Sequence, residues 1–224
     1  YFNLYTEEKK AEFSYEFKFE NDDLKYHYVR NELDIVVYEE LHINDKVVIK
    51  FDMQSGEKMV RLSDANKLDL NKFNGDISIV RYAYRNISKS EESLVFKKFY
   101  DYVEHMLLFW SLTNRGYVGY KTTPTSISEK IIKDGKLSEF ENFLKKIGSD
   151  YHLAPNEDNK HIDCVFKYGK APLNKIWSTG TNALTLYFHW YQYLKDVSFV
   201  FIDEFDAFYH WNVAVDIIKS LRGI

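Results

Sequence analysis

Three things are scarce in this chain: cysteine, long apolar runs and an excess of positive charge. The single cysteine, Cys164, excludes an internal disulfide framework and a cysteine-rich zinc site, and it fits a reducing cytoplasm. No apolar run approaches the length of a membrane span and no signal peptide is visible, so we expect a cytoplasmic protein without a membrane partner. The formal net charge of -4 argues against nucleic-acid binding by bulk charge alone, although a local basic patch is compatible with it.

Bulky side chains are abundant instead. Of the 224 residues, 45% are hydrophobic and 17% are aromatic, which predicts a large core built on rings. A chain of this length forms one large domain or a domain with an inserted lobe.

The most informative stretch runs from Val197 to His210. Five of its first six residues are apolar, and they lead directly into Asp203 and Glu204. A short continuous apolar run predicts a strand buried on both faces, as in a parallel sheet, and such sheets bind ligands at the carboxyl ends of their strands. Two carboxylates at that place suit a magnesium nucleotide site. The alternative is that the acids merely cap the following helix.

A second motif lies upstream of this strand. Trp177-Ser178-Thr179-Gly180-Thr181 precedes an apolar helical stretch from Asn182 to Leu194. Ser178 offers a hydroxyl, Gly180 allows the backbone to approach an anion, and a helix N-terminus presents unpaired N–H groups to a phosphate. The alternative is an ordinary serine N-cap followed by a loop glycine.

The N-terminal residues 1–52 predict an antiparallel β-meander that serves as scaffold. Glu12–Phe19 alternates strictly between apolar and polar residues, and Asn44-Asp45 is typical of a turn. Further strands are expected at Leu24–Tyr28, Asp34–Ile43 and Val47–Phe51.

Helical patterns dominate the middle of the chain. Residues 53–89 predict mixed loop with a short helix or strand, and Ser90–Leu112 predicts one amphipathic helix. Two shorter helices are expected at capping boxes that begin with Ser126 and Ser138. We therefore divide the chain into an antiparallel β subdomain at 1–89, a helical lobe at 90–148 and a composite segment at 149–224.

Besides the two motifs above, the last segment contains a predicted loop, a strand and a helix. A loop at 149–160 leads to a strand at His161–Lys167, and alternating faces explain His161 and Cys164 better than a metal pair does. After the acids, a helix is expected whose apolar stripe consists of Ala207, Trp211, Ala214, Ile218 and Leu221.

These motifs resemble those of the ATP-binding-cassette superfamily. Ser178-x-Gly180 is similar to the signature that opens a helix, and the run ending in Asp203 resembles the Walker B strand, 25 positions after Ser178. Residues 1–52, including Glu39-Glu40-Leu41, resemble the antiparallel segment of AAA-15-type ATPases of the SMC/OLD-like branch. The resemblance implies an α/β, ABC-type nucleotide-binding fold with an N-terminal β-meander and an inserted helical lobe.

The resemblance also implies roles for individual residues. Asp203 would hold Mg²⁺ through water, and Glu204 would polarise the water that attacks ATP. Asp206 matches the acid that couples the two sites of a dimer, and His210 is assigned no catalytic role. The γ-phosphate of ATP bound by the opposite subunit would be contacted by Ser178, Gly180 and Thr181. The implied cofactors are ATP and Mg²⁺, and the implied partner is a second copy, joined through ATP.

One expected part of such an ATPase is missing from these residues. The sequence contains no Gly-x-x-x-x-Gly-Lys-Ser/Thr loop, and Asn114–Thr122 fails as a disguised version because Tyr120 separates Gly119 from Lys121. We therefore interpret the chain, which begins at Tyr1, as a fragment lacking N- and C-terminal segments of a longer ATPase. Such a fragment should be inactive alone.

Three interpretations follow from the sequence. The first is an ATPase whose nucleotide-driven dimerisation powers an effector, in phage defence or DNA processing, with nucleic acid or an effector protein as a further partner. The second is a non-hydrolysing dimeric scaffold or regulator with a degenerate ATPase fold. The third is an unrelated α/β binding protein whose acids are structural.

Overall fold

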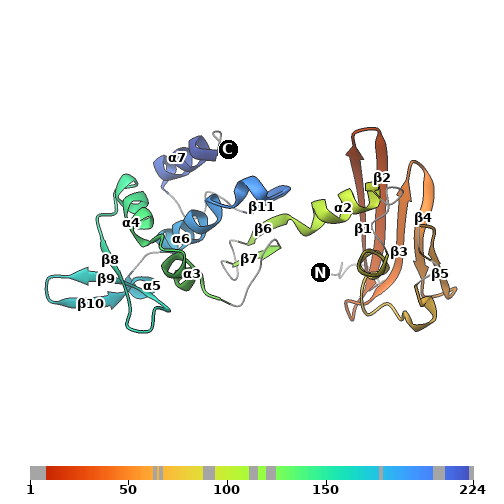
Figure 1. The fold of residues 1–224 in the computed structure, drawn as a ribbon, viewed down its shortest axis with the longest axis horizontal. Coiled ribbons are helices and arrows are strands. Elements are labelled where there is room, and N and C mark those ends of the chain that lie inside the picture. Colours follow the sequence, from red (N-terminus) through yellow and green to blue (C-terminus); the bar gives the residue numbers. More distant parts are fainter. Residues whose placement is uncertain are drawn as a thin grey trace. The chain divides into compact units, whose positions relative to one another are not determined.

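The computed structural model describes residues 9–62, 65, 68–87, 94–110, 116–119, 125–176, 179–203 and 210–221. The chain forms two compact units, which we call unit 1 (residues 1–103) and unit 2 (residues 104–224) (Figure 1). Both units mix helices with strands, so the α/β class is confirmed.

Unit 1 contains the predicted antiparallel meander. Neighbouring strands follow chain order throughout, so every connection is a local hairpin. Asn44 and Asp45 both have positive φ, as the predicted turn requires. The sheet has five strands, and the last of them lies within residues 53–89, where a mixed loop with a short helix or strand is predicted. They are β1 (Lys10–Phe19), β2 (Asp22–Asn31), β3 (Val36–Ile43), β4 (Lys46–Asp52) and β5 (Glu57–Val60).

Two helices pack on one face of this sheet, namely α1 (Ile79–Asn86) and α2 (Leu94–Glu104), and a 3₁₀ turn, η2 (Leu70–Lys72), precedes α1. The aromatic face predicted for β1 is confirmed, since Phe17 makes edge contacts with Phe99 and Tyr102 of α2. The buried core joins sheet and helices through residues that include Leu24, Leu41, Ile49, Phe51, Ile79, Ala83, Phe96 and Phe99.

The helix predicted over Ser90–Leu112 is too long. The helix α2 ends at Glu104, and Met106–Trp110 forms strand β6 instead. The run Met106-Leu-Leu-Phe-Trp is continuously apolar, and such a pattern is equally compatible with the apolar stripe of a helix and with a buried strand. Pairing with a distant strand decides between the two, because β6 lies beside β11 (Phe199–Ile202).

Unit 2 contains a three-stranded sheet in the order β11-β6-β7, where β7 is Gly116–Gly119. The pairing of β11 with β6 is parallel, as the sequence predicted, whereas β6 and β7 are antiparallel. Gly119 has a φ of 124°, and a Cβ there would clash with the Met106 carbonyl oxygen, so glycine permits this close pairing.

The prediction that β11 is buried on both faces is wrong. Phe199 and Phe201 are 46% and 49% exposed, while Val200 and Ile202 contribute to a core around Leu107, Phe109 and Trp190. Among the described strands, β11 has β6 as its one neighbour and lies at the edge of the sheet. An edge strand with one covered face alternates in burial, and a continuous apolar run does not reveal this.

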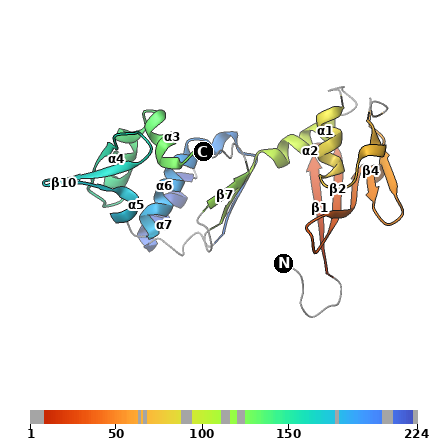
Figure 2. The ribbon, with the colours of Figure 1, turned by 90° about the horizontal axis from the view of Figure 1, so that it is seen from below.

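Helices and a second small sheet complete unit 2 (Figures 1 and 2). The predicted strand at His161–Lys167 is confirmed as Ile162–Phe166, but a strand also occupies part of the predicted loop 149–160. The three-stranded sheet consists of β8 (His152–Pro155), β9 (Ile162–Phe166) and β10 (Gly169–Pro172). The helices are α3 (Ile127–Lys133), α4 (Leu137–Lys146), α5 (Leu173–Ile176), α6 (Thr179–Tyr191), the 3₁₀ turn η4 (Leu194–Asp196) and α7 (Trp211–Leu221).

Of the two predicted serine caps, the one at Ser126 is confirmed and the one at Ser138 is wrong. The Ser126 hydroxyl accepts the Glu129 N–H at 3.2 Å at the start of α3. The next helix begins at Leu137, so Ser138 lies inside it and its N-cap, Lys136, makes no side-chain cap bond. The turn at Gly135, with φ 66°, brings the Lys136 N–H to the Ile131 carbonyl and thereby starts α4 early.

The predicted stripe on the last helix is partly wrong. Ala214 is buried, but Trp211 and Ile218 are 75% and 45% exposed, and Ile217 is the residue that packs inward. Ile217 meets Leu184 and Tyr187 of α6.

Candidate functional site

The candidate site lies at the carboxyl end of β11, where Asp203 follows Ile202 directly. The Asp203 N–H donates to the Phe109 carbonyl oxygen at 3.2 Å, so pairing with β6 extends one residue past the strand. Asp203 is half-buried. Its position at the end of two parallel strands is one where open α/β sheets bind ligands.

The second motif lies at the start of α6. This helix begins at Thr179, Gly180 is its second residue and is half-buried, and Thr181 is the third. The first N–H groups of any helix have no partner within the helix, which makes such an end receptive to anions. Ser178 immediately precedes the helix and lies outside the described residues.

Two further predicted site residues, Glu204 and Asp206, also lie outside the described residues. The chain is described again from His210, which is exposed and whose carbonyl oxygen accepts the N–H groups of Val213 and Ala214. Through its backbone, His210 therefore begins α7.

The helix α6 connects the two motifs through the core of unit 2. Its last turn carries Trp190, which is 1% exposed and makes an edge contact with Phe109 of β6. Gly180 and Trp190 are separated by ten residues of helix, which corresponds to about 15 Å along the axis. The Ser-x-Gly motif thus leads by one packed helix to the sheet that carries Asp203.

Next to Trp190, the same helix carries a buried histidine. His189 is 4% exposed and lies against Tyr193. Burial, together with the charge of Lys130, lowers the pKa of His189 to about 4. The imidazole is therefore neutral at pH 7 and acts as part of the core.

A metal would need few protein ligands here. Within the described ranges, no group of three or more His, Cys, Asp or Glu side chains could hold a metal ion. Mg²⁺ in nucleotide sites characteristically keeps several waters and uses one or two carboxylates plus the phosphates. A single carboxylate such as Asp203 is compatible with that ligand set.

Sequence reasoning missed a buried polar cluster in unit 1. Glu39 is fully buried, and its carboxylate accepts the hydroxyls of Tyr26 and Ser78 at 2.8 and 2.6 Å and the Ile79 N–H at 2.8 Å. Burial raises the pKa of Glu39, and the hydrogen bonds oppose that rise. The cluster fastens the N-terminus of α1 to β3, so its role is structural.

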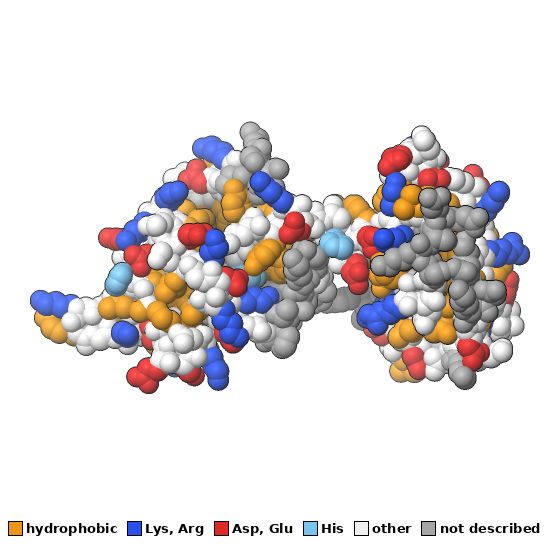
Figure 3. Space-filling model, viewed as in Figure 1, with side chains coloured by type: hydrophobic (Ala, Val, Ile, Leu, Met, Phe, Trp, Pro, Cys, Tyr) orange, Lys and Arg blue, Asp and Glu red, His pale blue; other side chains and the backbone are white. Residues whose placement is uncertain are grey.

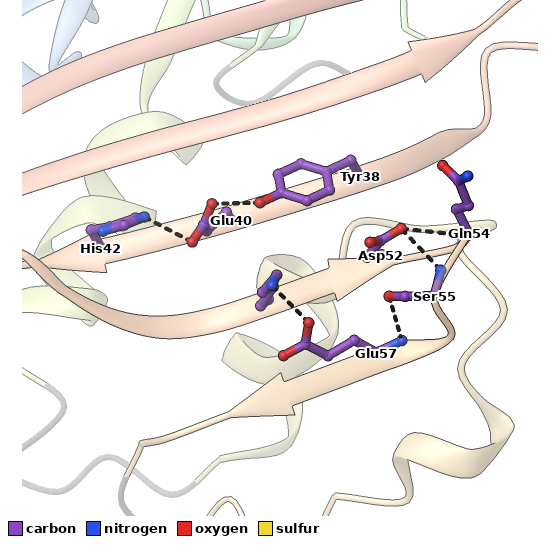
Figure 4. A network of polar contacts seen from close by, with 8 residues as sticks. Tyr38, Glu40, His42, Asp52, Gln54, Ser55 and Glu57 are labelled. Carbon is purple, nitrogen blue, oxygen red and sulfur yellow. Dashed lines mark hydrogen bonds and ion pairs between the residues drawn. The ribbon is translucent and has the colours of Figure 1, made fainter.

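The other face of the unit 1 sheet is polar. Glu40 accepts the Tyr38 hydroxyl at 2.6 Å and lies 3.0 Å from His42 Nε2, and Lys50 of β4 lies 2.6 Å from Glu57 of β5 (Figure 4). Acids and bases are also interspersed on the face of each unit that Figure 3 shows. Among the described side chains visible there, no large basic patch of the kind that binds nucleic acid is present.

Comparison of the chain with protein-family models, with curated proteins and with solved structures gives no match.

Within the described residues, none of the helices has the length and apolar character needed to cross a membrane.

Proposed function

We propose that this chain is part of an SMC/OLD-like ATPase in which ATP joins two copies and drives an effector. The observation that carries the proposal is the order of elements in unit 2. The helix that follows Ser178 packs against a parallel strand pair, and Asp203 stands at the carboxyl end of that pair. A helix end that can face a phosphate and an acid at a strand end are two of the protein parts that magnesium nucleotide sites use.

In this proposal the residues divide the work between two copies. Asp203 would hold Mg²⁺ through water, and Glu204 would orient and polarise the attacking water. Ser178, Gly180 and Thr181 would face the γ-phosphate held by the other copy, and Asp206 would couple the two sites. ATP and Mg²⁺ supply the phosphoryl group and the charge neutralisation for its transfer.

The first test is the gene sequence on both sides of these 224 residues. The proposal requires a Gly-x-x-x-x-Gly-Lys-Ser/Thr loop, because that loop supplies the lysine and backbone cradle for the β- and γ-phosphates. A gene that encodes no such loop would rule out hydrolysis and leave the non-hydrolysing dimeric scaffold as the better proposal.

The second test uses the complete protein. We expect Glu204→Gln to bind ATP, to accumulate as a dimer and to lose at least about 100-fold in turnover, because general-base catalysis contributes about that much. The matched control is Asp216→Asn on α7, since that carboxylate is exposed and paired with Lys219. Normal turnover in Glu204→Gln would remove its assignment as the base.

Dimerisation distinguishes the ATPase and the scaffold from an unrelated binding protein. A Ser178→Arg substitution should abolish ATP-dependent dimerisation by placing a long cationic side chain at the phosphate-facing end of α6. Dimerisation that persists in this variant would mean that Ser178 does not face the nucleotide of a second copy.

A further inference from the structure

The strand β1 presents a long open edge. It spans ten residues, and among the described strands β2 is its one neighbour. The opposite edge of the sheet is formed by β5, which spans four residues. An edge strand carries a row of unpaired N–H and C=O groups, and proteins normally keep such edges short, twisted or covered. The length of β1 therefore suggests that another strand pairs with it.

The side chains next to this edge are also incompletely covered. Phe17 and Phe19 lie beneath Tyr102 of α2, whereas Phe13 and Tyr15 are 37% and 43% exposed. Both rings stack on Tyr28 of β2. Together they form an apolar surface that continues to the open edge of β1. A strand added at β1 would bury that surface with its own apolar face.

The sequence of β1 is complementary to itself in an antiparallel register centred on Tyr15. When Tyr15 lies opposite Tyr15 of a second copy, residues 11–19 of the two strands pair with their faces matched. Phe13 then lies opposite Phe17, and Glu12 lies opposite Lys18. Two-fold symmetry produces each of these pairs twice.

Neighbouring registers are worse. Placing Ser14 opposite Ser14 sets Lys10 against Lys18 and Glu12 against Glu16, and like charges directly opposite each other are destabilising. An offset by one residue sets apolar side chains against charged ones. The charge pattern thus favours the register centred on Tyr15 over the one centred on Ser14. Registers centred on Phe13 or Phe17 also set unlike charges opposite each other, but they pair fewer residues of β1.

The two residues that form the cross-dimer charge pair, Glu12 and Lys18, remain accessible. The side chains of Glu12 and Lys18 are 70% and 72% exposed, although Glu12 lies 2.9 Å from His27 and Lys18 lies 3.2 Å from Asp23. Cross-dimer pairing would therefore add to two existing contacts of the β1–β2 hairpin, Glu12 with His27 and Lys18 with Asp23.

We propose that β1 pairs with β1 of a second copy of this chain, which joins the two unit 1 sheets edge to edge about a two-fold axis at Tyr15. The interface is isologous, so it closes at the dimer and does not propagate into fibres. It requires no nucleotide, and it is independent of the ATPase proposal.

The test is the oligomeric state of the 224-residue chain without nucleotide, measured by sedimentation velocity over a range of concentrations. We expect a monomer–dimer equilibrium. Glu12→Lys and Lys18→Glu should each weaken the dimer roughly tenfold, because each creates two like-charge pairs, and the double swap should restore it. A chain that is monomeric throughout, or single swaps without effect, would overturn the proposal.

Disulfide trapping tests the register separately. Residues directly opposite in an antiparallel pair have Cα atoms within disulfide range, so Tyr15→Cys should form a cross-linked dimer on oxidation. Ser14→Cys is the matched control and should not, and the native Cys164 is buried and does not compete. Cross-linking of Ser14→Cys in preference to Tyr15→Cys would contradict the register. If a dimer forms only when ATP is present, the β1 interface is overturned and the ATPase proposal still stands.

Discussion

The Ser78 hydroxyl donates to the Glu39 carboxylate across 2.6 Å, inside the core of unit 1. This bond joins the N-cap of α1 to the middle of β3, and the same hydroxyl accepts the Arg81 N–H at 3.1 Å. Ser78 therefore both caps the helix and anchors it to the sheet. A buried carboxylate is tolerated here because its lone pairs have partners.

Removing the carboxylate should destabilise unit 1 strongly. In Glu39→Ala, the hydroxyls of Tyr26 and Ser78 and the Ile79 N–H lose a buried acceptor, so we expect a loss of about 2–4 kcal/mol in the free energy of unfolding. Urea denaturation followed by circular dichroism measures it. Glu57→Ala is the control and should cost less than about 1 kcal/mol, because the Glu57 side chain is 46% exposed. Equal losses would contradict the anchoring role.

Alanine substitutions at two tryptophans, one buried and one exposed, test the core of unit 2. Trp190→Ala removes a side chain that is 1% exposed and packs on the β6–β11 sheet, so it should cost about 3–5 kcal/mol. Trp211→Ala removes one that is 75% exposed and should change the stability by less than about 0.5 kcal/mol. Differential scanning calorimetry on both variants checks this. A large effect at Trp211 would show that its surface is covered.

Acidification should destabilise the protein through His189. Burial lowers the pKa of His189 to about 4, below its ordinary value of 6.5. The unfolded chain therefore binds the proton first, and stability is lost as pH falls from about 6.5 to about 4, by at most about 1.4 kcal/mol per pH unit. His189→Gln should flatten this part of the pH profile, whereas the exposed His210→Gln should leave it unchanged. Identical profiles for both variants would refute the assignment.

A second pH effect should appear at lower pH through Glu141 of α4. Burial opposes ionisation of this carboxylate, but the Leu153 N–H, Lys145 and His152 outweigh it and lower its pKa to about 2. Stability that depends on the ionised form is present above about pH 4.5 and is lost toward pH 2. Glu141→Gln should remove this dependence and cost about 1–2 kcal/mol at pH 7 by weakening the link to β8. Glu139→Gln, whose carboxylate is exposed, is the matched control.

Local patterns predicted much of the fold. The alternation in Glu12–Phe19 and the turn at Asn44-Asp45 specify the N-terminal hairpins because each strand there pairs with the strand next to it in the sequence. The strand β6 could not be predicted in the same way. Met106–Trp110 is apolar throughout, and its partner β11 lies far along the chain, so long-range pairing decides its conformation.

The candidate site was predictable in part. The strand ending before Asp203 and the helix beginning near Gly180 follow from motif and pattern, whereas the exposure of Phe199 and Phe201 depends on which strands flank β11. Glu39 did leave a signal in the sequence. It shares the inward face of β3 with Leu41 and Ile43, and an acid on the inner face of a strand implies buried partners.

The parallel pairing of β11 with β6 has a consequence for synthesis. Phe199 lies beside Met106, so this sheet cannot close until the ribosome has released residues near 202. The hairpins of unit 1 need no such wait, because each strand meets its partner as soon as it emerges. During translation, the apolar strand β6 therefore stays without β11 for longer than any strand of unit 1 stays without its neighbour. In that interval β6 exposes apolar surface that a chaperone would bind.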